Sequence, residues 1–503
     1  MTTAQPDTDF LIIGAGFAGL CMGHHLKQAG LDRFRIVEKA SDLGGTWRDN
    51  HYPGAACDVQ SHLYSFSFHP KPDWSRFYAG WAEIKAYMDD CARAFGLLPH
   101  LQFNTEVTGM AWQEDRQLWR VRLGDRGHVD TRYVILATGP LHHPNIPALP
   151  GLDTFKGPVV HTARWDDSLP LSGKRVAVIG TGASAIQLVP ELAKTVGHLH
   201  VLQRTPAWVV PRPDRPYSEQ EKRRFARYPL LRKLHRARLY WQNEARFIPM
   251  HHPAISGVLA AAVRYRIRRT VKDPETARKL SPDYAIGCKR VLLSNDWFPT
   301  FNRPNVSLHT DGIDRIEADA IMLRNGTRLP VDVVVMATGF VVDPRKYLRN
   351  VDIVGRHGRE LKSVWADIPH AYKGITVPDF PNLFQMTGPN TGLGHSSIIF
   401  MIECQARYIL SAIQAGQARR LPVIEVRADV EADYNRQIQK KLARRVWASG
   451  CSSWYLDDKG RNFTLWPDTT TAYYLATRKV RLSDYHWYPL PAQIPEGTRT
   501  APA

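Results

Sequence analysis

The chain has 503 residues, of which 44% are hydrophobic and 23% charged, and its formal net charge is +18. This length allows two or three domains with hydrophobic cores, and the composition is that of a globular protein. Residues 1–9 are polar, unlike a secretory signal, and no run of residues approaches the roughly 18 apolar positions of a membrane helix. We therefore expect a cytoplasmic protein without an integral membrane segment.

The six cysteines, at positions 21, 57, 91, 288, 404 and 451, lie at least 34 residues apart. This spacing excludes a redox C-x-x-C pair and a local zinc knuckle. We expect reduced thiols with structural roles and no metal site.

An apolar strand runs into a glycine turn near the start of the chain, in the sequence DFLIIGAGFAG. Such glycines let the backbone approach a pyrophosphate, and the helix that begins there supplies free N–H donors. Glu38 follows Gly14 by 24 residues, where a carboxylate accepts hydrogen bonds from a ribose 2′-hydroxyl. The pattern predicts a site for an adenine dinucleotide with a free ribose, formed by Gly14, Gly16, Phe17, Ala18, Gly19, Glu38 and Lys39.

The same pattern recurs in KRVAVIGTGASA, but it ends on the opposite charge. Arg204 follows Gly180 by 24 residues, and its guanidinium can donate to a 2′-phosphate together with Thr205. A chain with both sites is predicted to be a flavoenzyme in which NADPH passes hydride to FAD. The predicted NADPH site consists of Gly180, Thr181, Gly182, Ala183, Ser184, Ala185, Arg204 and Thr205.

Each glycine turn opens a unit that closes on a β-branched run followed by Ala-Thr-Gly, at residues 137–139 and 337–339. Such runs mark the carboxyl ends of buried parallel strands, where ligands lie in open α/β sheets. We predict an α/β fold with two Rossmann-like dinucleotide-binding domains, one for FAD and one for NADP. The predicted boundaries are 1–140 for the first part of the FAD domain, 141–170 for a linker, 171–340 for the NADP domain with a helical insertion at about 212–285, and 341–503 for a return to the FAD domain and a C-terminal cover.

The predicted insertion is strongly basic, as in EKRRFARYPLLRKLHRARLYW. Basic helices with aromatic residues can bind nucleic acid or an anionic membrane surface. They can also form a solvated face that attracts an anionic cofactor, and the residues favour this second interpretation. Since both glycine turns and Arg204 are intact, we expect no nucleic-acid partner.

A second glycine-rich segment, LGGTWRDNHYPGAACDVQSHLYSF, follows the first turn. Gly44 and Gly45 indicate a loop close to a ligand, with flat surfaces from Trp47, Tyr52 and Tyr64. Asp58, judged alone, is a turn or cap residue more often than a catalytic one.

The predicted linker contains FKGPVVHTARWD at residues 155–166. The pattern F-x-G-x-x-x-H-x-x-x-W-D resembles the fingerprint of the type I Baeyer–Villiger monooxygenases, the ketone-oxygenating branch of the flavin-dependent monooxygenases. Its residues here are Phe155, Gly157, His161 and Trp165, and the resemblance extends from about residue 8 to about residue 480. Without the resemblance, His161 would be interpreted as a linker histidine bonded to backbone.

The resemblance implies roles for several residues. Asp58 matches the family's active-site aspartate, Arg290 its catalytic arginine, and Lys289 a lysine that recognises the 2′-phosphate. His161 and Trp165 would couple the position of NADP to the orientation of the domains. The residues of the flavin loop and of a mobile tryptophan segment that would complete the cofactor sites are Gly45, Thr46, Trp47, Asp58, Tyr64 and Trp454.

The implied function is an FAD-dependent, NADPH-consuming monooxygenase that inserts one oxygen atom of O2 next to a ketone carbonyl, through a flavin peroxide, to give an ester or lactone. Arg290, buried in a bidentate pair with Asp58, would stabilise the negative oxygen. The alternative is an S- or N-oxygenase of sulfides or amines, against which Trp165, Asp58 and Arg290 count. The expected partners are a small ketone, or a sulfide, and O2, and the expected state is a monomer or homodimer.

Overall fold

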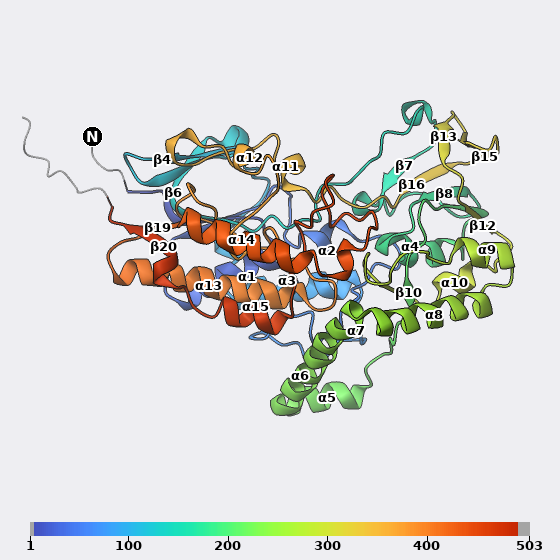
Figure 1. Cartoon of the computed structure of the whole chain (residues 1–503), viewed down its shortest axis with the longest axis horizontal. Coiled ribbons are helices and arrows are strands. Elements are labelled where there is room, and N and C mark those ends of the chain that lie inside the picture. Colours follow the sequence, from blue (N-terminus) through green and yellow to red (C-terminus); the bar gives the residue numbers. More distant parts are fainter. Residues whose placement is uncertain (1–4, 491–503) are drawn as a thin grey trace, which may run out of the picture.

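Two open sheets lie side by side along the long axis of the molecule in the computed structural model, which describes residues 5–490 (Figure 1). The first sheet is mixed, with strand order β17-β4-β5-β6-β1-β2-β3 and with β18 beside β6. Its central strands are runs of Phe, Leu, Ile and Val that are almost fully buried, as parallel strands covered on both faces require. The bounds are β1 Thr8–Ile13, β2 Phe34–Val37, β3 Leu101–Gln102, β4 Gly109–Gln113, β5 Leu118–Arg122, β6 His128–Leu136, β17 Asp352–Val354 and β18 Leu383–Gln385.

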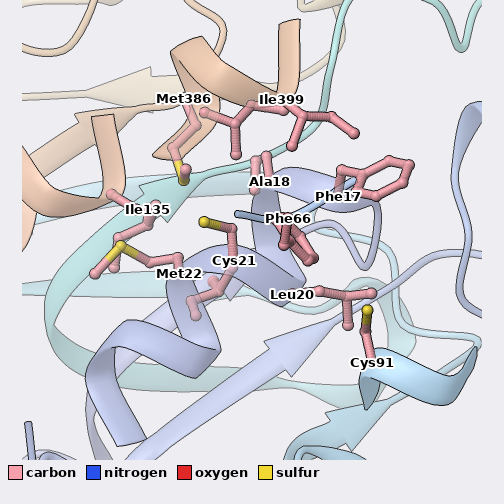
Figure 2. Packing of buried hydrophobic residues seen from close by; sticks show 14 of the residues in the cluster. Phe17, Ala18, Leu20, Cys21, Met22, Phe66, Cys91, Ile135, Met386 and Ile399 are labelled. Carbon is pink, nitrogen blue, oxygen red and sulfur yellow. The ribbon is translucent and has the colours of Figure 1, made fainter. Parts of the chain in front are cut away.

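The chain reaches β17 and β18 only after it has formed the second sheet, so its last third returns to the first one. Helix α1 packs between this sheet and α13, and Figure 2 shows Cys21 and Met22 of α1 gathered with Ile135 of β6 and Ile399 of α13. The helices of this unit are α1 Phe17–Gln28, α2 Thr46–Asp49, α3 Trp81–Ala94, α11 Pro344–Tyr347, α12 Leu361–Val364, α13 Ile398–Ala418, α14 Ala428–Leu442 and α15 Thr470–Ala476, with a hairpin of β19 Val423–Val426 and β20 Tyr485–Tyr488.

Helix α13 is the one helix among the described residues that is long and apolar enough to cross a membrane. Its apolar window is 61% buried inside the molecule, where it packs against α1. Its hydrophobicity is therefore that of a core helix.

The second sheet is entirely parallel, with strand order β12-β9-β8-β16-β7. The predicted linker supplies its edge strand β7, which pairs with β16 in register Val160 to Val335. The bounds are β7 Val159–His161, β8 Arg175–Ile179, β9 His198–Leu202, β12 Val306–His309 and β16 Val333–Met336, with helices α4 Ala183–Leu192 and α10 Trp297–Thr300 and an antiparallel sheet of β13 Ile313–Ile316, β14 Ala320–Leu323 and β15 Arg328–Pro330.

The basic segment leaves the second unit at β10, Val209–Val210, and returns at β11, Leu292–Leu293, and these two strands pair with each other. Between them run α5 Glu219–Arg227, α6 Pro229–Ala245, α7 Phe247–His251, α8 Pro253–Thr270 and α9 Pro274–Lys279. Helices α5, α6 and α8 lie along one edge of the molecule, away from the sheets (Figure 1).

The expectation that all the cysteines are reduced was wrong for two of them. Cys288 and Cys451 form a disulfide, with their Cα atoms 6.3 Å apart, across a sequence separation of 163 residues. The other four thiols, of Cys21, Cys57, Cys91 and Cys404, are free and buried. Sequence spacing excludes local cysteine pairs only, because it does not show which distant segments the fold brings together.

Candidate active site

The first glycine turn lies at the carboxyl end of β1, where the backbone passes too close to its neighbours for side chains. Gly14 has φ +110°, and a Cβ on it would lie 2.6 Å from the carbonyl oxygen of Ala137. A Cβ on Gly19 would lie 1.9 Å from the carbonyl oxygen of Gly14. Gly16 is the N-cap of α1 and has no side chain to occupy the free N–H groups of the first turn. These groups can therefore receive a pyrophosphate.

Glu38 follows β2 directly and is fixed beside this turn. Its carboxylate accepts hydrogen bonds from the N–H groups of Ala15 and Ala40, both at 3.0 Å, and lies 3.3 Å from the guanidinium of Arg48. Of the other predicted residues, Lys39 is exposed, whereas Phe17 and Ala18 face the core. Phe17 and Ala18 can therefore contribute only backbone groups to a cofactor site.

The flavin loop approaches the glycine turn from the side. A Cβ on Gly45, which has φ +49°, would lie 3.4 Å from the Cα of Gly16. Thr46 opens α2, and the indole N–H of Trp47 donates to the hydroxyl of Tyr64 at 3.1 Å. The predicted residues of this loop thus line one side of the first turn.

The second glycine turn has the same construction at the end of β8. Gly180 has φ +109°, and a Cβ on it would lie 2.4 Å from the carbonyl oxygen of Ala337. Gly182 caps α4 and has open space beside it, and the hydroxyl of Thr181 donates to the carbonyl of Thr205 at 3.0 Å. The remaining predicted residues lie in the first turn of α4, where Ala183 is exposed, Ser184 is half-buried and Ala185 is buried.

Arg204 and Lys289 come together beside this second turn, although 85 positions separate them in the chain. Partial burial and the charge of Arg204 lower the pKa of Lys289. Within residues 5–490 neither side chain forms an ion pair, and the ammonium of Lys289 lies over the ring of Tyr284. Two neighbouring cations that form no ion pair with an acid can bind an anion, which fits the 2′-phosphate of NADP.

Asp58 and Arg290 meet between the two units. Nε and Nη2 of Arg290 both donate to Oδ2 of Asp58, at 2.8 and 2.5 Å. The sequence predicted a buried, bidentate pair. In the structure both nitrogens of Arg290 bond to the same carboxylate oxygen of Asp58. The pair is only partly buried, because the side chains of Arg290 and Asp58 are 37% and 27% exposed. The charge of Asp58 raises the pKa of Arg290 further above its ordinary value, so the guanidinium is positive at every working pH.

Three other groups lie beside this pair, of which Tyr455 and Arg212 were not predicted from the sequence. Tyr455 of the C-terminal cover is buried, its hydroxyl has no partner among the described residues, and burial raises its pKa to about 12. Arg212 donates to the carbonyl of Cys57 at 3.3 Å. The hydroxyl of Tyr52 donates to Gln187 of α4 at 2.9 Å, so the flavin loop is bonded to the second unit. The sequence predicts Tyr52 as a flat surface of the flavin loop, whereas nothing local marks Tyr455.

The fingerprint residues connect the two units. A Cβ on Gly157 would lie 2.2 Å from the carbonyl oxygen of Asp332, and Phe155 packs under the second sheet. Nδ1 of His161 accepts from the N–H of Ala163 at 3.1 Å, so its Nε2–H donates to the carbonyl of Gly339 at 3.0 Å. Burial lowers the pKa of His161, which keeps this neutral form. Trp165 is buried, and its carbonyl lies 3.1 Å from Nε2 of His51 in the flavin loop.

The segment that holds Trp454 follows Cys451, and the disulfide ties it two positions from Arg290 in the chain. Trp454 is 46% exposed and packs against Tyr455. Within residues 5–490 there is no group of three His, Cys, Asp or Glu side chains that could hold a metal ion. The glycine cradles, the fixed Glu38 and the pair of cations fit two dinucleotides, FAD at the first turn and NADP at the second.

Comparison with known proteins gives a consistent result. A family profile described as pyridine nucleotide-disulphide oxidoreductase matches residues 11–228, a range that contains neither cysteine of the disulfide. The chain is 46% identical over 479 residues to a Baeyer-Villiger monooxygenase of Pseudomonas aeruginosa, covering 94% of this chain and 90% of that one. It is 42% identical to a Baeyer-Villiger monooxygenase of Streptomyces coelicolor, covering 98% and 95%.

Solved structures with the same fold are complexes with NADP, and one of them also contains FAD. An oxidized steroid monooxygenase bound to NADP superposes with a TM-score of 0.86 at 33% identity, covering 96% of this chain and 99% of that one. Cyclohexanone monooxygenase from Rhodococcus sp. Phi1 bound to NADP+ gives 0.87 at 29% identity, covering 96% and 100%. OTEMO in complex with FAD and NADP gives 0.87 at 27% identity, covering 96% and 100%.

Proposed function

Because this chain belongs to the Baeyer–Villiger monooxygenases, we propose that Arg290, positioned by Asp58, is the positive charge that stabilises the negative oxygen of its reaction. The chain is an FAD- and NADPH-dependent enzyme that inserts one oxygen atom of O2 next to a ketone carbonyl and gives an ester or lactone. Bound FAD, once reduced by NADPH, supplies the activated oxygen. The protein's own part is to hold the cofactors and substrate together and to place charge where the reaction needs it.

The observation that carries the proposal is the way in which Asp58 holds the guanidinium. Two of its three nitrogens bond to one carboxylate oxygen, and Nη1 has no partner among the described residues. The carboxylate thus fixes the orientation of Arg290 and leaves one edge free to donate to an oxyanion. Both side chains are partly exposed, so a reacting carbonyl can approach the guanidinium.

The proposed substrate is a largely apolar cyclic ketone. Two structural neighbours are named for cyclohexanone and for a steroid, both ring compounds. A cavity of about 550 Å³ lies between the flavin loop and α6, lined by Gln60, Phe77, His235, Leu239 and Arg246 among others, and its volume is in the range of small-molecule sites. One of the lining residues, Gln60, follows Asp58 by two positions in the chain. Sulfides are proposed as secondary substrates, and the proposed setting is a cytoplasmic monomer or homodimer.

The test is Arg290→Ala, with cyclohexanone and methyl phenyl sulfide as substrates. NADPH should still bleach the flavin, whereas ester formation should fall by roughly 100- to 1000-fold, as for other removed oxyanion donors. Sulfoxide formation should fall less, because a sulfide reacts without an oxyanion on the substrate. The exposed Arg303, changed to Ala, is the matched control and should behave as wild type. Full ester formation by Arg290→Ala would exclude the proposed role.

A further inference from the structure

We propose that the helical insertion, α5 to α8, is a docking surface for an anionic lipid bilayer. Eighteen large hydrophobic side chains are exposed among the described residues, and ten of them lie between positions 228 and 265. Single exposed apolar residues are normal on a protein surface, but this concentration in one segment indicates an interaction surface. The ten are Tyr228, Leu230, Leu231, Leu234, Trp241, Ile248, Ile255, Val258, Leu259 and Tyr265.

The apolar side chains of α6 form a stripe along the helix. Leu230, Leu234 and Trp241 are 68%, 60% and 61% exposed, and their spacing of four and seven residues places them on one side of the helix, with the exposed Ala237 between them. Ile248, in the following helix α7, is a further exposed apolar side chain, 65% exposed. An aromatic and aliphatic stripe of this kind is what an interfacial helix inserts at the boundary between headgroups and acyl chains.

The charges around the stripe are almost all positive. Residues 219–270 contain thirteen Lys and Arg side chains and three Glu. All three glutamates are already engaged, Glu219 with Lys222, Glu221 with Arg215, and Glu244 in the core with His395. The exposed Lys233 and Arg238 flank the stripe and form no ion pair within residues 5–490. Each such cation near an anionic membrane contributes about 1 kcal/mol of attraction.

The combination of apolar and basic side chains selects the partner. A nucleic acid would satisfy the arginines, but its phosphates would leave Leu230, Leu234 and Ile248 without an apolar environment. A second copy of the chain would cover the apolar stripe, but it would place two strongly basic faces against each other. An anionic bilayer satisfies both kinds of side chain at once.

The position of the stripe in the fold supports docking without rearrangement. Helix α6 is held rigidly on the flavin loop, because Arg236 donates to the carbonyl of His62 and Asn243 donates to Gln60 at 2.9 Å. The stripe lies on a different side of α6 from His235 and Leu239, which line the cavity of about 550 Å³. Docking would bring the bilayer beside this cavity. An apolar ketone could then pass from the bilayer into the cavity. The binding itself does not depend on the reaction that the enzyme performs.

The test is flotation of the FAD-loaded full chain with two kinds of vesicle. One consists of phosphatidylcholine alone, and the other contains 30% phosphatidylglycerol, so that about one lipid in three is anionic. We expect at least tenfold stronger binding to the anionic vesicles, and a further loss at 0.5 M salt because the charges are then screened. The double variant Leu234→Ser and Trp241→Ser should weaken binding at least tenfold, and so should Lys233→Glu. Matched controls are Leu475→Ser, a leucine 64% exposed on α15, and Lys346→Glu on α11, which should bind as wild type.

Flavin content and thermal midpoint show whether each variant is folded, and since the changed side chains are exposed, both should equal the wild-type values. Equal binding to neutral and anionic vesicles, no binding, or a double variant that binds like wild type would overturn the proposal. A dimer in solution that the double variant abolishes would assign the surface to a second copy. Binding of a DNA or RNA oligonucleotide that the double variant retains would assign it to nucleic acid. Either result would also overturn the proposal.

Discussion

At the scale of single residues, the choice between NADPH and NADH depends on Arg204 and Lys289. Burial and the charge of Arg204 lower the pKa of Lys289, and the charge of Asp283 offsets this only in part. A 2′-phosphate would relieve this repulsion and form charge-assisted hydrogen bonds, each of about 1.5–3 kcal/mol. NADH has no group to place there.

Reversing the charge at residue 204 should therefore change the preference for NADPH over NADH. We expect Arg204→Glu to raise KM for NADPH by about 10- to 100-fold, because the carboxylate repels the phosphate, while KM for NADH changes little. The measurement is steady-state NAD(P)H oxidation with both cofactors, and Arg303→Glu, at an exposed arginine elsewhere on the same unit, serves as the control. An unchanged ratio of the two KM values would show that Arg204 does not read the phosphate.

The residues that the sequence predicted are those with a local pattern. Gly14, Gly180, Glu38 and Arg204 each stand at a fixed distance from an apolar strand, and their positions in the structure agree with that pattern. Asp58 and Arg290 were found through a family resemblance, since their separation of 232 positions carries no pattern of its own. Tyr455 was missed because its position depends on how the C-terminal segment folds back over the site.

At the scale of elements, short segments held by long-range contacts were the hardest to predict. The three residues of β7 lie in a proline- and glycine-rich stretch that predicts an extended linker, yet they pair with β16. Strands of this length have too few residues to show a period of two. The disulfide is a further long-range contact, because it attaches the segment of Trp454 to the loop that precedes Arg290.

Breaking the disulfide should loosen this segment without unfolding the protein. A disulfide typically stabilises a protein by about 2–4 kcal/mol. We expect the double variant Cys288→Ser and Cys451→Ser to show faster hydrogen exchange at residues 446–456, and wild type to reach the same rate when a phosphine reductant is added. The variant, which has no disulfide to lose, is the control and should not respond to reductant. Identical exchange in wild type with and without reductant would contradict the tether.

At the scale of the whole molecule, burial makes the stability of the fold depend on pH through its histidines. Burial lowers the pKa of ten of the twenty, and it does so most clearly for His62 and His142, both to about 3. In the unfolded chain these imidazoles titrate near 6.5. The folded state therefore binds fewer protons than the unfolded state between about pH 6.5 and 4, so stability is complete above this window and falls as the pH drops through it.

His62 allows this dependence to be tested at one position. It packs edge-to-face against Tyr217 and Phe225, and its Nε2 has no partner among the described residues, so phenylalanine can replace the ring. We expect the thermal midpoint of wild type, followed by flavin fluorescence with excess FAD, to fall steadily from pH 7 to pH 5. Each buried imidazole contributes up to about 1.4 kcal/mol per pH unit in this range. The thermal midpoint of His62→Phe should match that of wild type at pH 8 and should fall less on acidification, because the unfolded variant binds one proton fewer. A wild-type midpoint that is flat from pH 7 to 5 would refute the argument.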